Sequence, residues 1–190
     1  MAAEYENSGN DEIRIYQNVW KNMRIALVCL VFAVAGYFMI FYNDDAGAKE
    51  YIAGWLGIIF FGGGALTVVG ISIYNKIRNI PFLIIRRDSV EMYVQKKGEY
   101  EVMDFSEIDG FRYIRFGRLR MIAVDFYEDA LKARFKDSSK IVRKMVRINM
   151  DYTGAAMNIP TDNLTMKGGD IYTILTDRLV SYKSLAAGAK

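Results

Sequence analysis

The feature that most constrains the fold of this chain is a pair of long apolar runs without a charged residue. The first run covers residues 25–42 (IALVCLVFAVAGYFMIFY) and the second covers residues 51–74 (YIAGWLGIIFFGGGALTVVGISIY). As helices they would reach roughly 27 and 36 Å, against a membrane hydrocarbon core of about 30 Å. A core helix of a globular protein usually carries a polar stripe, and neither run has one. The sequence therefore predicts two transmembrane spans, 25–42 and 51–74.

The charges that flank the two runs predict how they are oriented. Lys21 and Arg24 precede the first run, and Lys76 and Arg78 follow the second, whereas the connecting NDDAGAKE holds one lysine against three acidic residues. Because lysine and arginine are enriched on the cytoplasmic side of membrane spans, we expect both termini in the cytoplasm. A cleaved signal peptide is the alternative for the first run, although the run is longer than such a segment needs. We expect a multi-pass protein of the cell inner membrane.

Hydropathy and one proline divide the chain into three parts. Residues 1–12 are polar and acidic without periodicity, which predicts a disordered tail. Residues 13–79 are expected to hold an amphipathic lead-in, 13–23, and the transmembrane hairpin. The second span ends before Pro81, because the residue before a proline is pushed out of the helical region. Residues 80–190 are long enough for an independent cytoplasmic domain.

Within 80–190 the sequence pattern changes from strands to helices. Short apolar or alternating runs predict strands at 82–85, 90–95, 100–105, 111–116 and 119–126. A basic amphipathic helix is predicted over 138–150, where an alternating pattern leaves a strand as the alternative, and a short strand (155–160) and a helix capped by Asp170 follow. The expected fold class is a two-helix transmembrane hairpin followed by an α+β domain with an antiparallel strand meander, a helical insertion and a C-terminal amphipathic helix.

Two groups of basic residues are the candidate binding residues. The segment RYIRFGRLR forms the expected tip of a β-hairpin and contains Arg112, Arg115, Arg118 and Arg120. The segment KIVRKMVRINM places four cations on one side of the predicted helix, namely Lys140, Arg143, Lys144 and Arg147. We expect the apolar side of that helix, with Ile141, Met145 and Ile148, to pack on the strand meander.

The identity of the partner is open at this stage. The alternatives are a plain solvated surface, anionic lipid headgroups, a protein and a nucleic acid. Residues 80–190 hold 19 lysines and arginines against 15 aspartates and glutamates, a net charge of +4. A nucleic-acid-binding domain would have a stronger basic balance, so none is expected as a partner. Anionic lipids attract each nearby lysine or arginine by about 1 kcal/mol, which favours membrane lipids over a nucleic acid.

Small residues in the spans predict close helix packing. Ala53, Gly57 and Gly64 lie near one face of the second span, and Gly36 lies in the first. Small side chains let membrane helices approach closely. The predicted partner of this face is either the first span near Gly36 or a second copy of the chain.

Residues for catalysis are scarce. The chain has no histidine, and Cys29 lies within the first span. The adjacent carboxylates at Asp44–Asp45 and Glu128–Asp129 have no neighbouring residue that would complete a metal or acid–base site. We therefore expect no catalytic, cofactor-binding or metal-binding residues, no cofactor and no enzymatic activity.

Several segments resemble a known family. They are Ile15–Tyr16, Trp20–Lys21, GWLGIIFFG (54–62), PFLIIRRDSV (81–90), DFSEIDGF (104–111) and the tract from Asp129 to Leu175. Together they are similar to functionally uncharacterised bacterial proteins with two transmembrane helices and a cytoplasmic PH-like domain. The resemblance implies a PH-like fold for 80–190 and supplies no activity.

These observations lead to one expected function and one alternative. We expect a non-enzymatic inner-membrane protein whose PH-like module binds anionic lipid headgroups or a protein partner. The alternative is an accessory or assembly subunit of a membrane protein complex or homo-oligomer, in which the domain is a structural cap.

Overall fold

The computed structural model describes residues 5–8, 12–42 and 47–188, which divide into two compact units. One unit is formed by Gln17–Ile80. The other joins the chain from Pro81 onward with the segment that precedes Gln17. The apolar helices therefore interrupt the sequence of the strand-rich unit instead of preceding it.

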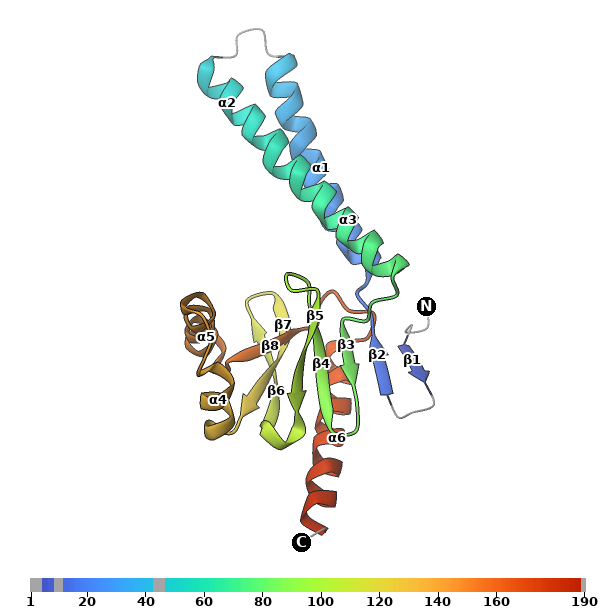
Figure 1. The fold of residues 1–190 in the computed structure, drawn as a ribbon. Coiled ribbons are helices and arrows are strands. Elements are labelled where there is room, and N and C mark those ends of the chain that lie inside the picture. Colours follow the sequence, from blue (N-terminus) through green and yellow to red (C-terminus); the bar gives the residue numbers. More distant parts are fainter. Residues whose placement is uncertain (1–4, 9–11, 43–46, 189–190) are drawn as a thin grey trace. The chain divides into compact units, whose positions relative to one another are not determined.

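The first unit is a helical hairpin (Figure 1). Helix α1 (Val19–Phe41) begins after Asn18, whose side chain accepts a hydrogen bond from the Lys21 amide. Helix α2 (Ala48–Gly57) continues through a π-helical turn, η1 (Ile58–Gly62), into α3 (Gly63–Ile77). Both Val19–Phe41 and Ala48–Ile77 are long and apolar enough to cross a membrane. Only 11% of the apolar window of each is buried within the chain, which distinguishes them from core helices.

The two helices of the hairpin approach each other closely at two glycines, Gly36 and Gly54. A Cβ atom added to Gly36 would lie 2.8 Å from the Gly54 carbonyl oxygen, and one added to Gly54 would lie 2.9 Å from the Gly36 oxygen. Gly57 approaches the same point, because a Cβ added to it would lie 3.8 Å from the Gly36 Cα. By contrast, Ala53 is exposed and a Cβ on Gly64 would meet open space. Neither Ala53 nor Gly64 packs against α1, because the face that meets α1 passes through Gly54, which the sequence prediction left out.

The second unit contains two antiparallel sheets (Figure 1). The five-stranded sheet has the order β1-β2-β3-β4-β5 and the three-stranded sheet has the order β6-β7-β8. The strands of the first sheet are β1 (Tyr5–Ser8), β2 (Glu12–Ile15), β3 (Leu83–Ile85), β4 (Ser89–Val94) and β5 (Glu99–Asp104). Those of the second sheet are β6 (Ile108–Phe116), β7 (Leu119–Phe126) and β8 (Met157–Pro160).

Helices and one short turn complete the unit. A 3-10 turn, η2 (Phe105–Glu107), leads from the first sheet to the second, and its Phe105 is fully buried. Helices α4 (Glu128–Phe135) and α5 (Lys140–Thr153) lie between β7 and β8 in the chain, and α6 (Gly168–Gly188) follows β8. The core joins Ile85 and Met103 of the first sheet, Ile122 of the second and Leu175 of α6. The predicted layout of two apolar helices and a strand-rich region with helices is confirmed.

The prediction for the N-terminal segment is wrong where the structure describes it. Residues 5–8 and 12 belong to strands rather than to a disordered tail, and residues 13–15 of the expected amphipathic lead-in continue the strand β2; the rest of 1–12 lies outside the described residues. Ile15 is fully buried and pairs with Leu83, which is 68 positions further along the chain. A four-residue strand shows too little periodicity to be recognised, and its pairing with β3 stabilises it.

Candidate functional site

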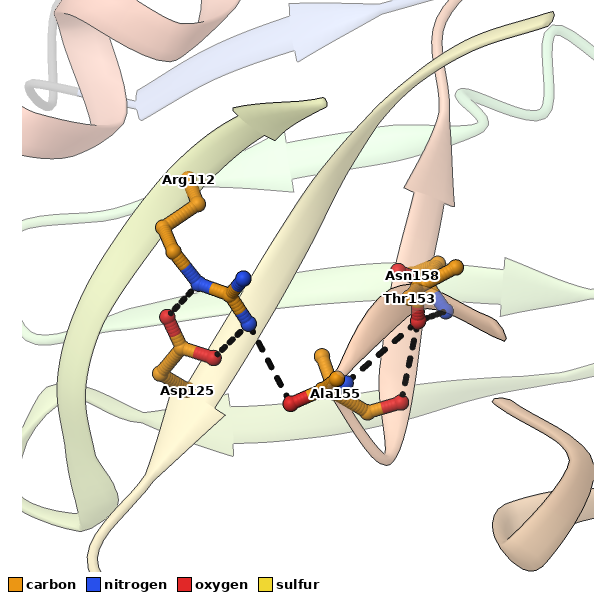
Figure 2. Close-up of polar contacts among 6 residues, drawn as sticks. Arg112, Asp125, Thr153, Ala155 and Asn158 are labelled. Atoms are coloured by element: carbon orange, nitrogen blue, oxygen red, sulfur yellow. Dashed lines mark hydrogen bonds and ion pairs between the residues drawn. The ribbon is translucent and has the colours of Figure 1, made fainter. Parts of the chain in front are cut away.

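Two of the eight basic candidates are neutralised within the unit. Arg112 makes a bidentate ion pair with Asp125, with Nε and a terminal nitrogen 2.6 and 2.7 Å from the carboxylate oxygens, and donates to the Gly154 carbonyl at 3.2 Å (Figure 2). The hydrogen bonds to Asp125 raise the pKa of Arg112. Arg120 donates from its backbone amide and Nε to Asp162 at 2.8 and 3.1 Å. Both arginines thus hold the three-stranded sheet to the segments that flank β8.

Two further candidates bind backbone carbonyls and keep their charge. Arg115 donates to the Gly117 oxygen at 2.9 Å, within the turn between β6 and β7. Arg143 donates to the oxygens of Ser138 and Lys136 at 2.9 and 3.3 Å, and so ties α5 to the end of α4. Neither forms an ion pair with a residue that the structure describes.

The other four candidates are exposed and have no polar partner within the described residues. They are Arg118, Lys140, Lys144 and Arg147. Together with Arg115 and Arg143 they make six cations without an acidic partner, which we call the basic set. The exposed Asp151 on α5 is an acidic residue on the same side of the helix as Lys144 and Arg147. Six cations against this carboxylate still leave a net positive charge.

Helix α5 is held at both ends. The Ser139 side chain accepts a hydrogen bond from the Val142 amide, and Gly154 ends the helix with φ +69°, a left-handed conformation suited to glycine. The Asn149 side chain donates to the Ala156 carbonyl at 3.0 Å. Thr153 Oγ1 accepts from the Asn158 side chain at 3.0 Å, as Figure 2 shows. The helix predicted over 138–150 is thus observed, and the strand alternative is not.

The apolar side of α5 does not pack on the sheet, contrary to the prediction. Ile141, Met145, Ile148 and Tyr152 are 71, 61, 43 and 66% exposed. They recur at i, i+4, i+7 and i+11, so they form one line along the helix, which we call the α5 stripe. The helix residues that face the unit are instead the half-buried Val146, Asn149 and Thr153. The prediction assumed two sides, one basic and one buried, whereas α5 has three: basic, buried and exposed apolar.

The structure brings the α5 stripe to the hairpin tip. The rings of Tyr152 and Phe116 have centroids 5.4 Å apart in an edge-to-face arrangement. Phe116 pairs with Leu119 across the β6–β7 turn, and both are about half exposed. The hairpin turn with Arg118 and the helix side with Lys140, Lys144 and Arg147 therefore border one apolar surface. Sequence reasoning missed this contact because the two ring positions are 36 residues apart.

Of the two carboxylate pairs, the structure describes only Glu128–Asp129. Glu128 binds Lys132 at 2.6 Å on exposed α4, and this hydrogen bond lowers the pKa of Glu128. Asp44–Asp45 lies outside the described residues. Among 5–8, 12–42 and 47–188, no three histidine, cysteine, aspartate or glutamate side chains are grouped to hold a metal ion.

Comparisons of the chain with protein-family models, curated proteins and solved structures found no match. The resemblance to bacterial two-span proteins therefore stays a prediction.

Proposed function

We propose that the chain is a non-enzymatic protein of the cell inner membrane whose strand-rich unit, a PH-like module, binds anionic lipid headgroups. In this proposal α1 and α2–α3 cross the bilayer and both termini are cytoplasmic. The observation that carries it is the basic set: six exposed or carbonyl-bound cations on α5 and the β6–β7 hairpin have no acidic partner among the described residues, whereas Arg112 and Arg120 are paired with Asp125 and Asp162.

The energetics fit a domain attached to a membrane. Each cation near an anionic surface contributes about 1 kcal/mol, reduced by screening over a Debye length of about 8 Å at physiological salt. Six such contributions are modest for recruitment from solution. The unit, however, is joined to the apolar helices by two short connections, residues 16–18 and 78–82. A short tether gives a high effective concentration, so weak attraction suffices to orient the domain.

The test uses the whole chain, because a fragment from residue 80 would lack β2 and its buried Ile15. The protein is placed in nanodiscs of neutral lipid or of neutral and anionic lipid, and amide hydrogen exchange is measured over 111–120 and 139–154. We expect slower exchange in the anionic discs, which reverts near 1 M salt, where the Debye length is about 3 Å.

Matched variants distinguish an effect of the basic set from an effect of net charge. Replacing Arg118, Lys140, Lys144 and Arg147 by glutamine should abolish the difference between the two lipids. Replacing the exposed Lys96, Lys97, Lys132 and Lys167 by glutamine removes the same charge and should leave the difference intact. Identical exchange of the wild-type chain in both lipids would refute headgroup binding and favour a protein partner or a structural cap.

A further inference from the structure

We infer that the α5 stripe, extended by Phe116 and Leu119, inserts into the boundary between lipid headgroups and acyl chains. This inference rests on the proposed headgroup binding and specifies its mode: α5 would lie along the membrane surface rather than remain above it. The occupant of this apolar surface is therefore a phospholipid bilayer.

The apolar surface itself favours insertion into a bilayer. Ile141 and Met145 are more exposed than buried, and the line continues through Ile148 to Tyr152. Single exposed apolar residues are common on soluble proteins, but a continuous line of them usually marks an interaction surface. The ring contact between Tyr152 and Phe116 extends this surface from the helix to the hairpin tip.

The position of the charges on α5 favours the same mode of binding. Successive helix residues are about 100° apart, so the stripe lies between the basic side with Lys140, Lys144 and Arg147 and the buried side with Val146 and Asn149. A helix that lies in a membrane interface has this arrangement, with cations beside an apolar face that enters the acyl boundary by about 5–10 Å. Aromatic rings such as Tyr152 and Phe116 favour the same depth.

Charge complementarity decides between a bilayer and a second copy of the chain. Two copies joined through the α5 stripe would bring two basic sets together, and like charges in proximity oppose association. An anionic bilayer offers an apolar phase and negative charge at once. Because short connections join the unit to the apolar helices, a bilayer that these helices cross would lie within reach of the unit.

The helix needs no folding step to insert. Its ends are fixed by Ser139 and Gly154, and its inner side is fixed by the bond from Asn149 to the Ala156 carbonyl. Arg112 holds the Gly154 carbonyl from the neighbouring strand. A preformed helix avoids the ordering cost of a segment that folds on binding.

The depth of insertion is measured by fluorescence quenching in the full-length protein. Cys29 is replaced by serine, and one environment-sensitive dye is attached through Met145→Cys in nanodiscs that contain anionic lipid. A matched control carries the dye through Ala133→Cys on exposed α4. Lipids that carry a nitroxide either on the acyl chain or on the headgroup serve as quenchers. We expect acyl-chain quenching of the dye at 145 and none at 133.

The other outcomes separate the two proposals. Quenching at 145 by the headgroup nitroxide alone would overturn insertion and leave headgroup binding standing. Quenching by neither would refute both. A dye at 145 that is sheltered from an aqueous quencher, without lipid quenching, would show that a protein covers the α5 stripe, and insertion would again be wrong.

A second set of variants tests the stripe without altering the basic set. In the chain labelled at 145, Ile141→Gln with Ile148→Gln should lower the ratio of docked to free domain by at least about tenfold, because two side chains lose their apolar environment. Ile141→Leu with Ile148→Leu should retain docking. Unchanged docking in the glutamine variant would overturn the inference, and unchanged thermal unfolding would confirm that these exposed sites do not support the fold.

Discussion

Helices α5 and α6 belong to the same unit and both carry apolar residues at helical spacing, yet only α6 uses them in the core. Ile171, Leu175 and Leu179 of α6 are 0, 0 and 5% exposed, whereas no residue of α5 is fully buried. An apolar stripe at helical spacing therefore predicts a helix but leaves open what the stripe contacts. In α6 it supports folding, and in α5 we propose that it supports binding.

One substitution in each helix tests this contrast most directly. Leu175→Ala should lower the free energy of unfolding by about 2–5 kcal/mol, because it leaves a cavity in the core. Met145→Ala should change it by no more than about 0.5 kcal/mol, since that side chain is 61% exposed. Chemical unfolding of the full-length protein in detergent measures both. A large loss at Met145 would mean that the α5 stripe is covered within the protein.

A similar contrast, between a glycine in a helix contact and one beside open space, holds in the helical hairpin. Gly54→Leu should destabilise it by about 1–3 kcal/mol, because even a Cβ would lie 2.9 Å from the Gly36 oxygen. Gly64→Leu, which points into open space, should cost little. Thermal unfolding in detergent compares the two variants. If Gly64→Leu alone disrupts an assembly of two copies, the small residues on that side serve a partner outside the chain.

A smaller contrast in stability separates an ion-paired cation, Arg112, from an exposed one without an ion pair among the described residues, Lys144. Arg112→Met removes the ion pair with Asp125 and the bond to the Gly154 carbonyl, and should cost about 1 kcal/mol because the pair is partly exposed. Amide exchange should accelerate at the C-terminal end of α5. Lys144→Met serves as the control and should leave stability unchanged while weakening headgroup binding. Equal effects on stability would show that Lys144 has a structural role.

The smallest expected effect is the pH dependence of stability that Tyr100 contributes. Tyr100 donates to the Pro81 carbonyl at 2.9 Å, and burial, followed by the neighbouring Tyr93 and Glu91, raises its pKa from 10.0 to about 12. The folded state therefore favours the neutral phenol, and its contribution to stability is complete below pH 10 and is lost as pH rises to about 12. Solvent screening of this partly exposed group keeps the loss to about 1 kcal/mol or less.

Unfolding measured from about pH 9 to 12 tests this expectation. Tyr100→Phe should flatten the alkaline loss of stability relative to the wild-type chain, and Tyr152→Phe on α5 is the matched control. The expectation fails if Tyr100→Phe leaves the alkaline profile unchanged.

Local patterns in the sequence predicted much of the secondary structure. The uncharged runs became α1 and α2–α3, the strand runs between 82 and 126 became β3 to β7, and the basic segment became α5. These predictions succeed because hydrophobic periodicity and capping act within a few residues. The last helix also forms where it was predicted, although α6 begins at Gly168, so Asp170 lies in its first turn rather than at its cap.

Only the tertiary structure decided the features that depend on distant partners. Pairing with β3 makes Glu12–Ile15 a strand, Asp125 neutralises Arg112 from the next strand, and Phe116 meets Tyr152 across 36 positions of sequence. Local sequence was enough to predict where the helices and most strands form and which side chains are basic or apolar. The fold determined which cations stay unpaired and which apolar stripe stays exposed, because burial and ion pairing depend on side chains from distant parts of the chain that no local pattern specifies.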